Sequence, residues 1–390
     1  MSEPKKPQVK PARPFFSSGP CVKRPGWTPD ALRDALIGRS HRSVDGRERL
    51  KLAVERTRDI LRLPPGYQVA IVPGSDTGAF ELAMWNLLGP RGVDVLAWDI
   101  FGRNWLRDAM AELKLADLRT LEAEAGHLPN LGKVDFSRDV LFTWNGTTTG
   151  VTVPDGNWIP DDREGLVICD ATSALFGEVI DLNKIDVLTY SWQKALGGEA
   201  AHGMLVASPR ALERLASYRP PWPVPKLFRL TNQDGVMHDV FEGVTINTPS
   251  MLCVEDYLDA LTWIEGLGGL DAAIWRARVN SQVLYDWIDR TPWVAPLGAD
   301  PQTRSHTPVA MRFADPGLMS ASESVRLDVM RELVRLLEAE AAGFDIAAYR
   351  GMPAGLRVWC GATVERDDIV ALLPWLEWAY AKARKEAVSG

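Results

Sequence analysis

Short apolar runs alternate with helical stretches between residues 50 and 210. Each run has six or seven residues and is bounded by Gly, Pro or Asp; they are YQVAIVP (67–73), VDVLAWD (93–99), DVLFTWN (139–145), GLVICD (165–170) and DVLTYSW (186–192). Such runs, separated by stretches long enough for a helix, are typical of βαβ units. We therefore expect an α/β fold with a mainly parallel sheet and helices on both faces. Ligands of such sheets bind where the strands end.

The pattern changes after residue 219. The segment 219–250 is rich in proline and predicts a loop. From residue 251 longer amphipathic helices follow, for example over 321–340, and a last helix is expected from about Asp367. The runs TPVAMRFAD (307–315) and LRVWCGA (356–362) predict strands of a second, smaller α+β domain. We expect a disordered leader at 1–14, a large domain at 15–255 and a small domain at 256–390.

Composition excludes several classes of protein. Hydrophobic residues make up 46% of the 390 residues and charged residues 24%, with a net charge of −7, as in ordinary soluble globular proteins. This balance does not suggest a nucleic-acid partner. No apolar run reaches the roughly 18–20 residues of a membrane span, and the polar, Pro-rich start lacks the apolar core of a signal peptide. We expect a cytoplasmic protein.

Metal binding and disulfides are not expected. The four cysteines, Cys21, Cys169, Cys253 and Cys360, lie far apart without paired spacing, and none of the five histidines forms a ligand-like pair. Buried free thiols are the preferred interpretation.

The stretch IVPGSDTGAFELAMWNLL is a candidate phosphate site. A buried strand runs into Gly74, Ser75, Asp76 and Thr77, and a helix is expected to begin near Ala79. Free N–H groups at a helix N-terminus suit a phosphate, but Ser and Asp also cap helices for structural reasons, and the two interpretations have about equal weight. Because the Asp76 carboxylate would repel a phosphate, we expect its backbone to bind.

Two further strand ends carry chemically useful side chains. Asp170 closes GLVICD and Lys194 follows DVLTYSW, so both fall at the carboxyl edge of the expected sheet. Asp170 could instead cap a helix, and a lone lysine is usually solvated, as we expect of Lys184. Their occurrence on successive strands favours a joint site.

A carboxylate, a lysine and a helix N-terminus are the three anchors that pyridoxal phosphate needs. The carboxylate keeps the pyridine nitrogen protonated, the lysine forms a Schiff base with the aldehyde, and the helix start receives the phosphate. We therefore expect the protein to bind pyridoxal 5'-phosphate as its cofactor, anchored by Lys194 and Asp170.

Several short motifs, in their order and spacing, resemble the phosphoserine aminotransferases, a class V group of pyridoxal-phosphate enzymes. The resemblance runs from about Phe15 to the C-terminus. Its motifs are FSSGP (16–20), HRS (41–43), NGTTTG (145–150), DATS (170–173), WQK (192–194) and NTP (247–249). It implies the aspartate-aminotransferase-like fold of type I, with a mainly parallel seven-stranded sheet in the large domain, and a homodimer.

The resemblance also implies roles for single residues. Lys194 and Asp170 would be catalytic, and Thr147 would donate to the phenolic oxygen of the cofactor. Trp105 is the aromatic residue expected to stack on the cofactor ring, with Phe101 second. The cofactor phosphate would be held by Ser75, Asp76, Thr77 and Gln193, and by Asn247 and Thr248 from the partner subunit.

The implied substrates carry several negative charges. L-Glutamate and 3-phosphohydroxypyruvate would give 2-oxoglutarate and O-phospho-L-serine, in serine biosynthesis and in pyridoxine biosynthesis as a second role. Arginine suits carboxylate and phosphate because its planar fork donates two parallel hydrogen bonds. The residues matched to this task are His41, Arg42, Arg350 and Arg357.

The chain departs from the family pattern near the substrate. Asp76 and Thr77 stand where better-known bacterial members carry an arginine, and Tyr349 stands where they carry a histidine. One cation toward the substrate phosphate is therefore missing or supplied from elsewhere, with Lys226 and Arg229 as candidates. This variant pattern resembles a branch of the family found in some proteobacteria and methanogenic archaea.

Other functions remain open at this stage. A serine- or alanine-glyoxylate aminotransferase would share the cofactor anchors but would not need several substrate-binding arginines. A binding protein of the same fold would do no chemistry. A cysteine desulfurase needs a mobile reactive cysteine, for which only Cys21 is a candidate. A dinucleotide-dependent dehydrogenase is disfavoured because no G-x-G-x-x-G follows the first strand.

Overall fold

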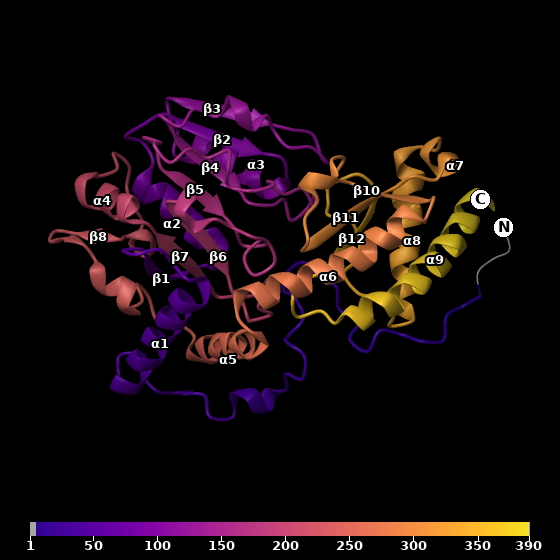
Figure 1. Ribbon diagram of the computed structural model, residues 1–390, viewed down its shortest axis with the longest axis horizontal. Coiled ribbons are helices and arrows are strands. Elements are labelled where there is room, and N and C mark those ends of the chain that lie inside the picture. Colours follow the sequence, from indigo (N-terminus) through magenta and orange to yellow (C-terminus); the bar gives the residue numbers. More distant parts are fainter. Residues whose placement is uncertain (1–4, 390) are drawn as a thin grey trace.

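The computed structural model describes residues 5–389, and a seven-stranded sheet forms its larger part (Figure 1). The strand order is β1-β7-β6-β5-β4-β2-β3, and only β7 runs antiparallel to its neighbours. The strands are β1 (Gln68–Pro73), β2 (Val93–Ala97), β3 (Leu118–Glu122), β4 (Asp139–Thr143), β5 (Val167–Asp170), β6 (Val187–Ser191) and β7 (His202–Ala207). The mainly parallel seven-stranded sheet is therefore confirmed.

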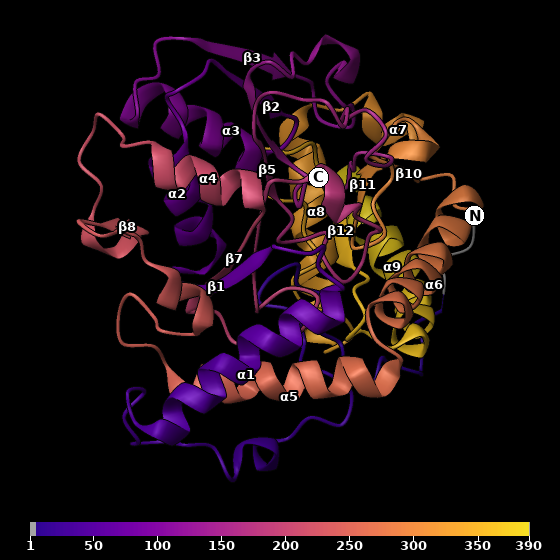
Figure 2. The ribbon, with the colours of Figure 1, turned by 60° about the vertical axis from the view of Figure 1, so that its left-hand side comes forward.

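Helices cover both faces of this sheet. Alternate strand residues, such as Val72 and Ile168, pack against α2 (Ser75–Leu87), α3 (Ile100–Arg107) and α4 (Pro209–Ser217). The residues between them, such as Ile71 and Cys169, face the side of α1 (Val44–Leu61) and α5 (Met251–Leu267), which lie side by side in Figure 2. Strands buried on both faces read as continuous apolar runs, which is why the sequence shows them clearly.

A smaller unit follows in the chain. Its antiparallel sheet has the order β10-β11-β12, and α6, α8 and α9 pack around it (Figure 1). The elements are α6 (Leu270–Asp289), β10 (Val294–Pro296), β11 (Pro308–Phe313), α7 (Pro316–Met319), α8 (Glu323–Ala339), β12 (Gly355–Trp359) and α9 (Arg366–Ser389). The expected helices over 321–340 and from about Asp367 correspond to α8 and α9.

The proposed domain boundary at residue 255 falls inside α5. This helix stays with the large unit, because Tyr257 bonds Thr57 of α1 and Glu265 bonds Arg56. We propose a division after α5, at Gly268 and Gly269, where the chain turns into α6.

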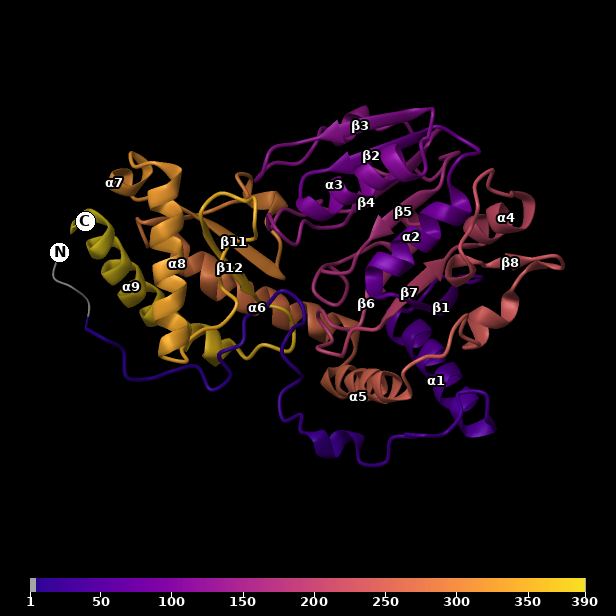
Figure 3. The same ribbon diagram turned by 180° about the vertical axis from the view of Figure 1, so that it is seen from behind.

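The structure corrects the prediction of a disordered leader for residues 5–14; residues 1–4 lie outside the described part. This segment runs beside the small unit (Figure 3). Its Val9 carbonyl accepts a hydrogen bond from the Trp375 indole at 2.7 Å, and the Asp368 carboxylate accepts one from the Ala12 N–H at 2.6 Å. Proline-rich composition indicated the absence of helix and strand, but not the absence of fixed contacts.

Other elements differ from expectation in detail. Strand β3 was not predicted, because it is a half-exposed edge strand without a continuous apolar run. Strand β7 was not predicted either, because the glycine-rich stretch before it gives no clear signal for where the strand begins. The segment 219–250 is mostly loop, with a small hairpin of β8 (Thr231–Asn232) and β9 (Gly235–Val236). No helix among residues 5–389 is long and apolar enough to cross a membrane.

Candidate active site

The carboxyl ends of neighbouring parallel strands bring the predicted residues together. Asp170 is the last residue of β5, Lys194 follows β6 by three residues, and Thr147 lies in the turn after β4. They line a cavity of about 240 Å³. Its lining comprises Gly19, Pro20, Ser75, Asp76, Thr77, Phe101, Trp105, Thr147, Asp170, Thr172, Ser191, Gln193, Lys194 and Ala200.

Lys194 is buried at this cavity, with 9% of its surface exposed. Its Nζ donates to the carbonyl of Ser18 at 2.6 Å, and it lies 5.9 Å from the centre of the Phe101 ring. Burial lowers the pKa of the amine, because a desolvated ammonium is disfavoured, and the guanidinium of Arg357 lowers it further. A neutral amine is the form that reacts with an aldehyde.

The turn between β1 and α2 presents backbone donors to the same cavity. Gly74 and Ser75 both have left-handed backbone angles, and α2 starts at Ser75 instead of near Ala79. The first bond within the turn joins the Gly78 N–H to the Gly74 carbonyl, so the N–H groups of Asp76 and Thr77 precede it. A β-carbon on Gly78 would lie 2.0 Å from the Pro73 carbonyl oxygen, so this tight turn requires glycine there.

Asp170 is held by two donors. Its Oδ1 accepts from the Thr172 N–H at 2.9 Å and its Oδ2 from the Trp105 indole at 3.0 Å. The carboxyl of Asp76, which is also buried, lies beside it. Burial and then Asp170 raise the pKa of Asp76 well above its usual value. Burial also raises the pKa of Asp170, but the Thr172 N–H, Asp76 and Trp105 lower it.

Arg357, in β12, approaches the cavity from the small unit. Its guanidinium donates to the Thr147 carbonyl at 3.2 Å and lies 5.4 Å from the centre of the Tyr349 ring. Tyr349 in turn lies against Phe101, with 6.0 Å between the ring centres. Within the described residues, the buried Nε of Arg357 has no hydrogen-bond partner.

The remaining predicted residues do not line this cavity in the single chain. Arg42, Arg350 and Thr248 are exposed, and His41 and Asn247 are partly exposed. The candidates for the missing cation were Lys226 and Arg229. Both residues are exposed, and the turn Lys226–Phe228 packs against α2. Arg357 is therefore the one predicted substrate cation whose guanidinium contacts a lining residue within residues 5–389.

Five lining residues were not predicted as site residues. Thr172 lies two residues after Asp170, and Ser191 lies three residues before Lys194. Their hydroxyl oxygens are 3.0 Å apart. Gly19 and Pro20 belong to FSSGP, a motif for which no chemical role was predicted, and the fifth residue is Ala200. Four of these five lie within or next to the motifs, which was the available signal, but only the fold brings them to the cavity.

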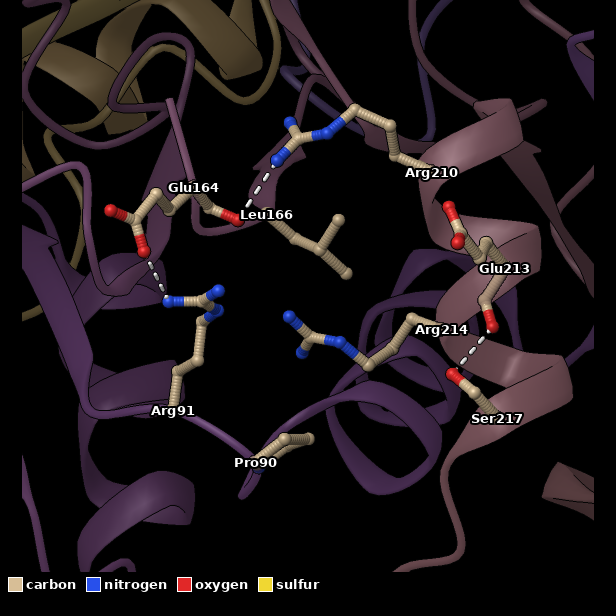
Figure 4. A pocket seen from close by; sticks show the side chains of 8 residues that line it. All are labelled: Pro90, Arg91, Glu164, Leu166, Arg210, Glu213, Arg214 and Ser217. Atoms are coloured by element: carbon tan, nitrogen blue, oxygen red, sulfur yellow. Dashed lines mark hydrogen bonds and ion pairs between the residues drawn. The ribbon is translucent and has the colours of Figure 1, made fainter. Parts of the chain in front are cut away.

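A larger hollow of about 450 Å³ lies near the amino ends of the strands. Figure 4 shows the side chains that line it. Leu166, which precedes β5, and three arginines line it. Each guanidinium is already engaged: Arg210 with Asp186, Arg214 with Asp139, and Arg91 with Glu164. We therefore interpret these arginines as structural, and the smaller cavity is the candidate active site.

All four cysteines are free thiols, and Cys253 is only partly buried. No group of three or more His, Cys, Asp or Glu side chains within residues 5–389 is arranged to hold a metal ion. Burial raises the pKa of the Cys21 thiol to about 12, which makes it a poor nucleophile at neutral pH.

Comparison with family models gives no match. Phosphoserine aminotransferases of Methanosarcina mazei and Methanosarcina barkeri are 52% and 51% identical to the chain over 375 residues, which is 96% of this chain and 99% of each relative. The structure of a phosphoserine aminotransferase from Cytophaga hutchinsonii has a TM-score of 0.79 at 19% identity, over 93% of this chain and 98% of that one.

An alanine–glyoxylate aminotransferase from Nostoc sp. has a TM-score of 0.75 at 19% identity, over 96% of this chain and 97% of that one. The fold alone therefore does not separate these activities. Sequence identity does, and it points to relatives from methanogenic archaea, as the variant motifs predicted. With about half of its residues shared over nearly the whole length, the chain belongs to the phosphoserine aminotransferase family.

Proposed function

We propose that this protein is a pyridoxal-phosphate-dependent phosphoserine aminotransferase that acts as a cytoplasmic homodimer. It would transfer the amino group of L-glutamate to 3-phosphohydroxypyruvate, giving 2-oxoglutarate and O-phospho-L-serine. The reaction belongs to serine biosynthesis, and a similar acceptor in pyridoxine biosynthesis would suit the same site.

One observation carries the proposal: a buried lysine of lowered pKa shares a small cavity with a buried aspartate and a helix N-terminus. A lysine of lowered pKa is present at neutral pH more often as the free amine, which is the form that acts as a nucleophile and takes up a proton. A lysine with only a structural role would be paired with an acid, whereas Lys194 donates to a neutral carbonyl.

Pyridoxal phosphate fits the donors and acceptors around this cavity. Buried polar atoms without a partner in the described chain, at or next to the lining residues, include Ser18 Oγ, Gln193 Oε1 and Arg357 Nε. Buried groups of this kind are normally satisfied, so their clustering around one cavity indicates a polar ligand. When bound, the cofactor supplies an electron sink for the carbon that exchanges the amino group.

The residues divide the task of holding the cofactor. The N–H groups of Asp76 and Thr77 and the hydroxyl of Ser75 would bind its phosphate at the start of α2, and Asp170 would face its ring nitrogen. We propose Phe101, in place of Trp105, as the aromatic that stacks on the ring. The Trp105 indole N–H is bonded to Asp170 and its ring packs on Phe80, whereas Phe101 lies over Lys194.

Lys194 would also move the proton of the substrate, because its amine is free once the amino acid has taken its place. The substrate carboxylate would bind Arg357, whose Nε has no partner among residues 5–389. The remaining cations would come from a second subunit, since His41 and Arg42 lie away from the cavity of their own chain. Asn247 and Thr248 would reach the cofactor phosphate in the same way.

The visible spectrum of the purified protein tests this proposal. Pyridoxal phosphate bound to Lys194 should absorb in the visible range, and L-phosphoserine should abolish that band, whereas L-serine and L-alanine at equal concentration should not. A band that responds only to alanine or serine would favour a glyoxylate-type aminotransferase. A protein that binds no cofactor would leave only the non-catalytic alternative.

A further inference from the structure

The carboxyl of Asp76 is not explained by phosphate binding. Asp76 lies in the first turn of α2, where a carboxylate usually caps backbone N–H groups, but the N-cap position is Gly74 and the turn has no side-chain cap. Only 5% of the Asp76 surface is exposed. Its Oδ1 is fully buried and, as a carboxylate oxygen, has no donor among the described residues.

Asp170 is the nearest acidic neighbour and is equally buried, with 4% of its surface exposed. Both carboxyls line the same cavity, and they lie within hydrogen-bonding reach of each other. Two carboxylates in contact inside a protein do not both stay ionised, because burial and mutual repulsion are each relieved by one proton.

The neighbouring donors decide where that proton resides. Each oxygen of Asp170 accepts a hydrogen bond, one from Thr172 and one from Trp105. These bonds stabilise the ionised form of Asp170. Among the described residues, Asp76 has a single neighbouring donor, the hydroxyl of Thr189, and burial and then Asp170 outweigh it and raise the pKa of Asp76. The proton therefore belongs to Asp76, and the hydrogen it carries can be donated to Asp170.

We propose that Asp76 is a positioning residue: it remains a neutral carboxylic acid and donates a hydrogen bond to Asp170, which keeps its negative charge directed at the ring nitrogen of the cofactor. This inference rests on the proposed function of Asp170. It also explains an aspartate in a turn that receives a phosphate, since a neutral side chain turned toward Asp170 does not repel that group.

The first test is spectroscopic and does not require turnover. Infrared spectra of the protein at pH 8, with and without ¹³C-labelled aspartate, should show the C=O stretch of a buried carboxylic acid. This band should disappear in Asp76→Asn and persist in Glu81→Gln, a matched control that removes a partly buried acid from the outer part of the same helix. A wild-type spectrum without the band, or a band that survives in Asp76→Asn, overturns the proposal.

The second test separates a donor from a charge. Pyridoxal phosphate should bind Asp76→Ala about tenfold more weakly than wild type, because a hydrogen bond to a charged group is lost. Asp76→Asn should restore most of that affinity, since its amide also donates to Asp170. Equal losses in both variants would mean that Asp76 acts through a negative charge, which overturns the proposal. Thermal unfolding of both apo-variants checks that they fold.

Cofactor binding by the wild type and by Asp170→Asn tells a failure of the proposed function from a failure of the proposed role of Asp76. If the wild type binds pyridoxal phosphate and Asp170→Asn weakens that binding, the proposed function stands. The Asp76 variants then test the role of Asp76 alone. If the wild type leaves the cofactor free in solution, the proposed function fails and the inference fails with it.

Discussion

At the scale of single residues, Lys194 and Lys184 illustrate how surroundings decide the use of an amine. Lys194 is buried against a carbonyl and has a lowered pKa. Lys184 bonds the exposed Asp161 at 2.5 Å, near the surface. One lysine is thus buried beside a cavity without an acid bonded to its amine, and the other is held in an ion pair with an exposed acid.

Replacing Lys194 with Ala should lower turnover by roughly a thousandfold or more, because both the nucleophile and the proton carrier are removed. The fold should remain, since the change deletes a costly buried amine. Steady-state assays with glutamate and phosphohydroxypyruvate, together with circular dichroism, check both points. Lys184→Ala is the matched control and should retain activity. Appreciable multiple turnover by Lys194→Ala would contradict the assignment.

Gly19 fixes the position of the same amine. A β-carbon at Gly19 would lie 2.9 Å from both Cε and Nζ of Lys194, and the backbone there has a φ of +141°. Gly19→Ala should therefore displace the amine and weaken cofactor binding about tenfold or more, which a titration with pyridoxal phosphate measures. Gly26→Ala is the control, because Gly26 also has a positive φ but open space around it. Equal affinities of the two variants would argue against this role of Gly19.

At the scale of elements, a buried acid joins the two units. Glu178, in the loop after β5, accepts hydrogen bonds from the Ser305 hydroxyl at 2.8 Å and the His306 N–H at 2.6 Å, just before β11. Burial raises the pKa of Glu178 to about 7 from its ordinary 4.5. The folded protein therefore binds more protons than the unfolded chain between these two pH values, and its stability falls as the pH rises through that window.

Glu178→Gln should remove this part of the pH dependence, because the amide keeps an acceptor oxygen and does not ionise. Between pH 5 and pH 8, the free energy of unfolding of the wild type should fall more than that of the variant, by on the order of 2–3 kcal/mol. Urea denaturation at both pH values measures the difference, with Glu48→Gln on the exposed face of α1 as control. Parallel pH curves for wild type and Glu178→Gln would contradict this expectation.

The elements that build the site were predictable to different degrees. The strands that end at Asp170 and before Lys194 are buried on both faces, so their sequences are continuous apolar runs. The pairing of Asp76 with Asp170 was not predictable, because it joins the first turn of α2 to the end of β5 through side-chain geometry. Nor was the choice between Phe101 and Trp105: both lie on α3 and line the cavity, and only their contacts distinguish them.

At the scale of the whole molecule, the expected site residues fall into two sets. One set lines the cavity, and the other, which includes Arg42 and Asn247, lies away from it in the same chain. The family resemblance predicts both sets and assigns Asn247 and Thr248 to the partner subunit, but it names no chain for Arg42. A symmetric dimer that places the second set over the cavity of its partner would unite them.

Mixed dimers test this arrangement. Subunits carrying Lys194→Ala and subunits carrying Arg42→Ala should each be nearly inactive alone. Coexpressed in equal amounts, they should recover about a quarter of wild-type activity, because half of the dimers are mixed and each mixed dimer has one intact site. Recovery near zero would place Arg42 and Lys194 of the same chain in one site. Size-exclusion chromatography of each mixture shows that dimers form.

The N-terminal segment has a consequence for the order of folding. Ser18 and Gly19 cover the amine of Lys194, yet the neighbouring Phe16 is held by Phe344 and Trp359, and Val9 by Trp375 in the last helix. Contacts so distant in sequence form slowly during folding. The wall over Lys194 should therefore close only after α9 has packed, so that the cofactor is not enclosed before this helix has folded.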